Sequence, residues 1–181
     1  MGLLEGKYVN LRIVEKEDMP LFTEWFNDTK FFGEFGSPSQ WSQAELQRFL
    51  ESTVFDTKVF FIENKNGSKI GYVIYFNVLA PYMKMLELGY AVIPSERGKG
   101  CCTEAAKMMV DHLFLSKDVA RIQATTHTKN VISQKILEKI GFKREGTMRK
   151  CWLCRGEWTD MFIFSILREE WKGPRILTRK T

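Results

Sequence analysis

The sequence predicts one α/β domain, residues 1–181, in which helices cover the faces of a mixed β-sheet. Three observations support this prediction. An Asn-Gly pair at Asn66-Gly67 separates two apolar segments, which is a strong signal for a β-hairpin. The apolar segments after residue 93 instead alternate with helical patterns, as crossover connections between strands require. The chain has 181 residues, 44% of them hydrophobic, which suits one ordinary domain with a sizeable core.

The first part of the chain is expected to contain one strand, two helices and a long loop. Residues 8–14 alternate between apolar and polar side chains, which indicates a strand. Residues 15–28 begin with acidic side chains and continue with an apolar stripe, which is typical of a helix. Residues 29–41 are aromatic and rich in Gly, Ser and Pro, so we expect a loop. Ser42 and Glu45 have the spacing of a capping box, which predicts a helix to about residue 52.

The rest of the chain is expected to complete the sheet. The hairpin around Asn66-Gly67 precedes a third strand at residues 84–94, and a helix follows from about Gly100 to residue 115. Later elements are a strand at 119–128, a helix at 130–142 closed by Gly141, two strands at 143–154 and 157–167 around a turn, and a basic tail at 172–181.

Composition narrows the class of protein. The formal net charge of +5 favours anionic ligands but is too small and too scattered to indicate nucleic-acid binding by itself. The first residues carry charges and no long apolar core, so we expect no secretion signal, and no apolar run is long enough for a membrane span. Four cysteines in such a chain suggest reduced thiols, and we expect a cytoplasmic protein.

The segment "PSERGKGCCTEAA", residues 94–106, joins the third strand to the following helix. It is not a P-loop, because Lys99 is followed by Gly100 rather than Ser or Thr. It is not a dinucleotide fingerprint either, because Thr103 stands where the third glycine belongs. Glycines before a helix N-terminus still allow free N–H groups to surround a phosphate, with Arg97 adding charge. A plain strand–helix turn is the alternative.

Four segments of the chain resemble one protein family. "LELGYAVIPSERGKGCCTEA" is similar to the acetyl-coenzyme A signature of the GNAT N-acetyltransferase superfamily, in which the loop follows R/Q-x-x-G-x-G/A. "NVISQKILEKIGF" resembles a later helix of that superfamily, and "NLRIVEKEDMPLFTEWFND" and "GEWTDMFIFSIL" resemble its RimJ/RimL-type branch. The resemblance covers nearly the whole chain in the right order. It implies a mostly antiparallel sheet that splays open at an acetyl-coenzyme A site.

The resemblance also implies which residues bind acetyl-coenzyme A (acetyl-CoA). The strand before the loop would pair with the pantetheine arm, the loop would surround the pyrophosphate, and a helix N-terminus would lie near the thiol. Carried onto this sequence, these residues are Ala91, Val92 and Ile93 for the arm, Arg97, Gly98, Lys99, Gly100, Cys101 and Cys102 for the pyrophosphate, and Asn130 near the thiol. No metal is expected.

Acetyl transfer to a primary amine is the reaction that the resemblance implies. Glu87 is the candidate base, since a carboxylate in an apolar strand is costly unless it is paired, at an edge or functional. The Val92 N–H would hold the thioester oxygen, and Ser133 would donate to the sulfur. The tyrosine that many relatives carry in the later helix is replaced by Leu137, and Trp152 stands near the place of another family glutamate. Ordinary structural roles for Glu87 and Ser133 remain open.

Aromatic residues are the candidates for the wall of the acceptor pocket. They could hold the carbon chain of an amine or a cation. The candidates are Phe31, Phe32, Phe35 and Trp41 from the early loop, and Trp152 and Trp158 from the last hairpin. Some of them could equally be core residues. A protein N-terminus, an aminoglycoside-like drug, a polyamine and an amino acid all remain open as acceptors.

The four cysteines are expected to be structural rather than ligands. Helical spacing places Cys102 on the stripe that faces the sheet, and Cys101 is then the more exposed thiol, at a helix N-terminus that could lower its pKa. Cys151 and Cys154 form C-x-x-C within a strand, where an odd separation directs them to opposite faces unless the strand bulges.

Two other functional classes are weighed against the enzyme. The main alternative is a non-catalytic coenzyme A sensor on the same fold, which the leucine at position 137 would suit. A nucleic-acid binder would rely on the short basic tail alone, with no groove-reading motif beside it. A homodimer is possible, as is common in the RimJ/RimL-type branch.

Overall fold

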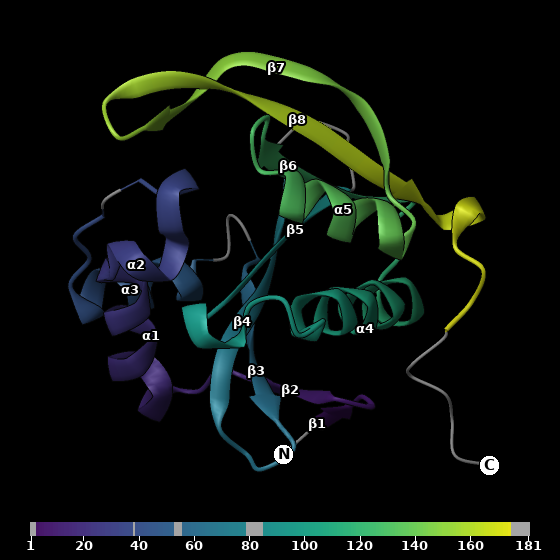
Figure 1. The fold of residues 1–181 in the computed structure, drawn as a ribbon. Helices are drawn as coiled ribbons and strands as arrows, with labels where there is room; N and C mark the ends of the chain where they lie inside the picture. Colours follow the sequence, from purple (N-terminus) through teal and green to yellow (C-terminus); the bar gives the residue numbers. More distant parts are fainter. Residues whose placement is uncertain (1–2, 38, 53–55, 79–84, 175–181) are drawn as a thin grey trace.

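A computed structural model describes residues 3–37, 39–52, 56–78 and 85–174 of the chain. Within these residues eight strands form one sheet in the order β1-β2-β3-β4-β5-β6-β8-β7 (Figure 1). Every pair of neighbouring strands in this sheet is antiparallel except β5–β6. The strands are β1 (Leu3–Glu5), β2 (Val9–Ile13), β3 (Lys58–Asn64), β4 (Lys69–Asn77), β5 (Met85–Val92), β6 (Arg121–His127), β7 (Lys143–Cys154) and β8 (Glu157–Leu167).

Helices cover both faces of the sheet, as the sequence predicts. They are α1 (Met19–Asn27), α2 (Thr29–Phe32), α3 (Gln43–Glu51), α4 (Cys101–Ser116) and α5 (Val131–Ile140). One hydrophobic cluster joins α4 and α5 to one face, and a second joins α1, α2 and α3 to the other (Figure 1). The strand alternation supplies both clusters: on β3, Phe60 belongs to the first and Phe61 to the second.

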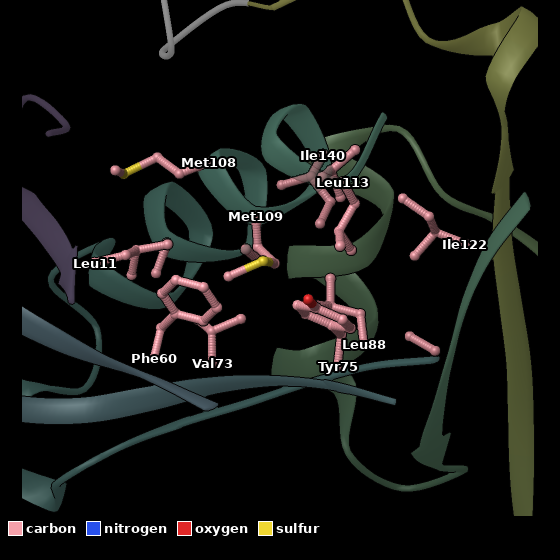
Figure 2. Packing of buried hydrophobic residues seen from close by; sticks show 14 of the residues in the cluster. Leu11, Phe60, Val73, Tyr75, Leu88, Met108, Met109, Leu113, Ile122 and Ile140 are labelled. Atoms are coloured by element: carbon pink, nitrogen blue, oxygen red, sulfur yellow. The ribbon is translucent and has the colours of Figure 1, made fainter. Parts of the chain in front are cut away.

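The larger cluster is built on α4. Figure 2 shows Met109 extending from this helix toward Phe60 and Val73, which belong to β3 and β4. Met109 and Val73 are fully buried, so this packing excludes water and fixes α4 against the sheet. The N-terminus of α4 therefore has a fixed place beside the end of β5.

Local signals explain why several elements begin and end where they do. Ser42 caps α3 and forms the expected capping box with Glu45. Asn130 caps α5, and Gly141 ends that helix with a φ of 108°. The hairpin between β3 and β4 turns at Gly67, where φ is 81°.

Two features of the first part of the chain differ from the sequence prediction. The short strand β1 was not expected; it pairs with β2 through the register Leu4↔Leu11. Residues 29–41 are not a plain loop, because they contain the helical turn α2 and a 3₁₀ turn at Gly33–Phe35. The side chain of Asp28 caps α2, and Phe31 stacks on Trp25 at 5.0 Å between ring centroids. Packing of these rings gives the segment a defined path.

The carboxylate of Glu104 attaches the N-terminal hairpin to α4. It accepts hydrogen bonds from the backbone N–H groups of Lys7, Tyr8 and Val9 at 2.8, 2.7 and 2.8 Å. Glu104 is 9% exposed, so these bonds satisfy both a buried charge and three backbone donors.

Strands β5 and β6 separate after a short parallel contact. They pair only from Met85↔Arg121 to Glu87↔Gln123, although both strands continue for four or five residues more. On its other side β5 stays paired with β4 along its length. The sheet is therefore open between the second halves of β5 and β6, where the resemblance predicts a splay.

None of the helices formed by the described residues is long and apolar enough to span a lipid bilayer.

Candidate active site

A cavity of about 580 Å³ occupies the opening between β5 and β6. Its wall also includes parts of α2, the start of α5 and the β7–β8 hairpin. Among the residues singled out from the sequence, the cavity is lined by Phe31, Phe32, Ala91, Val92, Arg97, Cys102, Asn130, Ser133 and Trp152. Residues distant in sequence are thus brought to one site.

The backbone of β5 presents polar groups to the open side of the sheet. The N–H of Ile93 donates to the carbonyl oxygen of Ile70, beside β4, at 2.9 Å. The backbone of Ala91, two residues earlier on β5, faces β4 in the same way. In an antiparallel ladder alternate residues face opposite neighbours, so the N–H groups of Tyr90 and Val92 face the opening instead. The Val92 N–H therefore faces the opening, whereas the N–H groups of Ala91 and Ile93 face β4, which differs from the expectation that these two pair with the pantetheine arm.

The turn before α4 has the geometry of an anion site. Gly98 and Gly100 have φ values of 76° and 85°, a backbone conformation that suits glycine, and a Cβ added at either would meet nothing within 4 Å. Gly100 is the N-cap of α4 and provides no side-chain cap. The first N–H groups of this long helix therefore receive no hydrogen bond from an N-cap side chain, which suits a phosphate group as their acceptor.

The two predicted cations of this turn are engaged with the protein itself. Arg97 donates to the carbonyl oxygens of Phe31 at 2.6 Å and Lys30 at 3.2 Å, at the end of α2. Lys99 is paired with Glu96 at 2.9 Å on the exposed surface. Arg97 therefore joins the turn to the α2 wall of the cavity, and Lys99 lies outside the cavity.

The prediction that Cys101 is the more exposed of the adjacent cysteines is wrong, whereas Cys102 packs against the larger cluster as a partly buried side chain. Cys101 is 8% exposed and belongs to the core, so it is not the accessible thiol, and burial raises its pKa. Cys102 lines the cavity, and burial raises its pKa to about 12. Desolvation outweighs the helix N-terminus at both thiols.

The C-x-x-C cysteines lie in separate environments. The register of β7 shifts between Met148 and Trp152, so the strand does bulge. Cys151 is nevertheless exposed, whereas Cys154 is buried and its thiol lies 3.6 Å from the carbonyl oxygen of Glu34. Among the described residues, no three His, Cys, Asp or Glu side chains come together as they would to bind a metal.

Glu87 lies behind the cavity wall rather than on it. Its carboxylate accepts hydrogen bonds from Gln123 at 2.9 Å and from the hydroxyl of Thr125 at 2.7 Å. Thr125 itself lines the cavity. Glu87 is thus hydrogen-bonded within the sheet, and Thr125 links it to the site.

The start of α5 places Ser133 on the cavity wall. The side-chain oxygen of Asn130 accepts from the N–H of Ser133 at 3.1 Å, which confirms Asn130 as the helix cap. The hydroxyl of Tyr90 lies 3.2 Å from the Ser133 hydroxyl. The sequence analysis did not select Tyr90. The one indication was that a tyrosine, with its polar hydroxyl, shares a face of the third strand with Leu86 and Leu88.

Trp41 does not belong to this site. It packs against Phe49 at 6.0 Å between ring centroids and exchanges hydrogen bonds with Asn27, beside the second cluster. Its role is to hold the segment before α3 against α1. Phe31, Phe32 and Trp152 remain on the cavity wall.

A second cavity of about 520 Å³ adjoins the first and shares Glu34, Phe35 and His127 with it. Trp158 lines this second space. The Nδ1 atom of His127 accepts from the backbone N–H of residue 129 at 3.0 Å, so the neutral ring carries its proton on Nε2.

A family model described as an acetyltransferase (GNAT) domain matches residues 9–143. The chain therefore belongs to the GNAT acetyltransferase family, as its fold and the open sheet already indicate. It is 30% identical over 146 residues to an uncharacterized N-acetyltransferase, YnaD, of Bacillus subtilis (strain 168), covering 72% of this chain and 85% of the relative. It is 26% identical over 106 residues to the [ribosomal protein uS5]-alanine N-acetyltransferase of Escherichia coli (strain K12), covering 59% and 55%.

Solved structures share the fold over most of the chain. The ribosomal-protein-S5-alanine acetyltransferase from Vibrio fischeri has a TM-score of 0.80 at 23% identity, covering 95% of this chain and 100% of that chain. The spermidine N-acetyltransferase from Vibrio cholerae, in complex with CoA and spermine, has a TM-score of 0.77 at 20% identity, covering 90% and 97%. These structures confirm the fold that the resemblance to the RimJ/RimL-type branch implies.

Proposed function

We propose that this acetyltransferase moves the acetyl group of acetyl-CoA directly onto a primary amine. The observation that carries the proposal is the continuous cavity along the open side of β5. It begins near the glycine turn before α4 and reaches the aromatic residues of α2 and the last hairpin. A donor and an acceptor can therefore meet where β5 and β6 separate, which supplies much of the rate by positioning alone.

The cofactor would be held mainly by backbone groups. The N–H groups that follow Gly98 and Gly100 would bind the pyrophosphate, and α4 adds its positive N-terminal dipole. The pantetheine arm would bond to the groups of Tyr90 and Val92 that face the opening. Acetyl-CoA supplies a thioester that is already activated for attack.

Three groups are proposed to assist the transfer. The amine would lose its proton toward Glu87 through the Thr125 hydroxyl, which already donates to that carboxylate. The Val92 N–H would bind the thioester oxygen as it gains charge, because it faces the opening. Ser133 would donate to the departing sulfur from the wall formed by α5.

The acceptor enters, in this proposal, through the second cavity. Glu34, Phe35 and His127 lie on both cavities and mark the passage between them. The relatives named above include enzymes for a ribosomal-protein alanine and for spermidine, so a protein N-terminus and a small-molecule amine are the two acceptor classes to test. Protein N-terminal peptides, polyamines, amino acids and aminoglycosides should be screened with a free-thiol readout.

Calorimetry with acetyl-CoA and with CoA tests the cofactor site. Gly100→Glu should abolish binding, because the new carboxylate would occupy the phosphate position and repel it. Gly67→Glu is a matched control, since Gly67 also has a positive φ and open space around its Cα but lies in the β3–β4 turn. Absence of binding in the wild-type protein refutes the proposal. Binding without thiol release for any amine supports a coenzyme A sensor instead.

A further inference from the structure

The side chains of Tyr90 on β5 and Ser133 on α5 meet at the cavity wall. Their hydroxyl oxygens are 3.2 Å apart, where either can donate, and the Tyr90 hydroxyl also donates to the Ser133 carbonyl oxygen at 3.3 Å. Both residues line the cavity. These separations are at the long end for hydroxyl pairs, so the Ser133 hydroxyl can still turn toward a ligand.

The neighbouring hydrogen bonds limit how the pair can orient. Asn130 accepts from the Ser133 N–H, so the serine backbone is fixed and only its hydroxyl can rotate. A serine hydroxyl carries one proton and two lone pairs. The single Tyr90 proton has two acceptors within reach, the carbonyl oxygen and the hydroxyl oxygen of Ser133. When it points at the hydroxyl oxygen, the Ser133 proton must point elsewhere, and the cavity borders both residues.

We propose that Tyr90 is a positioning residue for the leaving group: its hydroxyl donates to Ser133 Oγ and thereby directs the Ser133 proton at the thioester sulfur. This inference rests on the proposed function and deepens it. It also explains how the site can lack the tyrosine that many relatives carry at the position of Leu137. Here a tyrosine hydroxyl reaches the cavity from β5 instead of α5.

The reaction balances without another reactant. The amine nitrogen forms a bond to the carbonyl carbon and loses one proton, and the carbon–sulfur bond breaks with its electron pair going to sulfur, which gains one proton. Ser133 donates its hydrogen bond to the sulfur as negative charge develops there. Burial raises the pKa of Tyr90, so its hydroxyl keeps its proton and continues to direct Ser133.

Other titratable groups on the cavity wall could also affect a bound thiol. They are Glu34, Tyr72, Arg97, Cys102 and His127. Tyr72 provides a matched control, because it is a second buried tyrosine of this wall, on β4, whereas the Ser133 hydroxyl is paired with Tyr90. Tyr72→Phe therefore removes a hydroxyl from the same cavity and should leave the bound sulfur unaffected.

The test measures the pKa of the thiol of bound CoA, from thiolate absorbance against pH. The complex with desulfo-CoA is subtracted, which removes the protein's own tyrosines and cysteines from the signal. In the wild type the bound thiol should have a lower pKa than in Tyr90→Phe by about one unit, a roughly tenfold difference in thiolate population. Ser133→Ala should raise the pKa at least as far, and the double variant no further than Ser133→Ala.

Each other outcome overturns the inference. If the thiol pKa is unchanged in Tyr90→Phe and CoA is still bound, the positioning role of Tyr90 is refuted and the proposed function stands. Additive shifts in the double variant mean that Tyr90 does not act through Ser133. Absence of CoA binding in the wild type overturns the proposed function together with this inference.

Discussion

Replacing Glu104 by Gln should destabilise the fold by removing a buried charge that three backbone N–H groups share. The glutamine oxygen can still accept from Tyr8 and Val9, but its NH₂ group then faces the N–H of Lys7, donor against donor. Two bonds lose their charge assistance, about 1 kcal/mol each, and one donor loses its acceptor, about 1–3 kcal/mol. The total is about 3–5 kcal/mol, which lowers Tm by roughly 6–20 °C in a chain of this size.

Urea unfolding followed by tryptophan fluorescence measures this effect. Glu138→Gln is the control, because Glu138 is exposed on α5 and its replacement should change the free energy of unfolding by less than about 0.5 kcal/mol. If Glu104→Gln unfolds at the same urea midpoint as the wild type, with the same m-value, the three bonds do not stabilise the fold and the reasoning is wrong.

Three further predictions concern acid stability, turnover and thiol accessibility. Burial raises the pKa of Asp18, but the Arg12 guanidinium outweighs it and holds that pKa well below its usual range. The resulting stability is present above the unfolded-state pKa of about 4 and is lost as the pH falls. In urea unfolding, the free energy of unfolding of the wild type should therefore approach that of Asp18→Asn below about pH 4. A difference between the two proteins that does not change with pH contradicts this. Glu87→Gln should lower turnover by roughly 100-fold while calorimetry shows unchanged acetyl-CoA affinity, and wild-type turnover would exclude Glu87 as the base. In maleimide labelling followed by mass spectrometry, exposed Cys151 should react first and the buried Cys101 and Cys154 last, and equal rates would refute the assigned burial.

Much of the fold is predictable because its signals are local. The capping box of Ser42 and Glu45, the turn at Gly67 and the cap at Asn130 each act within a few residues, and the structure contains all three. The early aromatic segment was predicted poorly because its helical turn depends on Phe31 stacking on a residue of another helix. Such packing leaves no periodic pattern in the sequence.

The candidate site was predictable in its backbone but less so in its side chains. Glycine spacing located the turn before α4, and the resemblance to the GNAT superfamily implied the open side of β5. The helical stripe failed at Cys101 because α4 is buried on several sides, so a single stripe does not identify its buried face. The pairing of Tyr90 with Ser133 joins residues 43 positions apart, and no local rule connects them.

The short contact between β5 and β6 has a consequence for stability as well as for chemistry. Three residue pairs join two halves of the sheet, and beyond them the N–H groups of Tyr90 and Val92 have no neighbouring strand. A ligand with amide groups along its length can serve there as an additional strand of the sheet. A ligand that bound there only in the folded chain would link saturation and folding thermodynamically, so its concentration would help to set the stability of the protein.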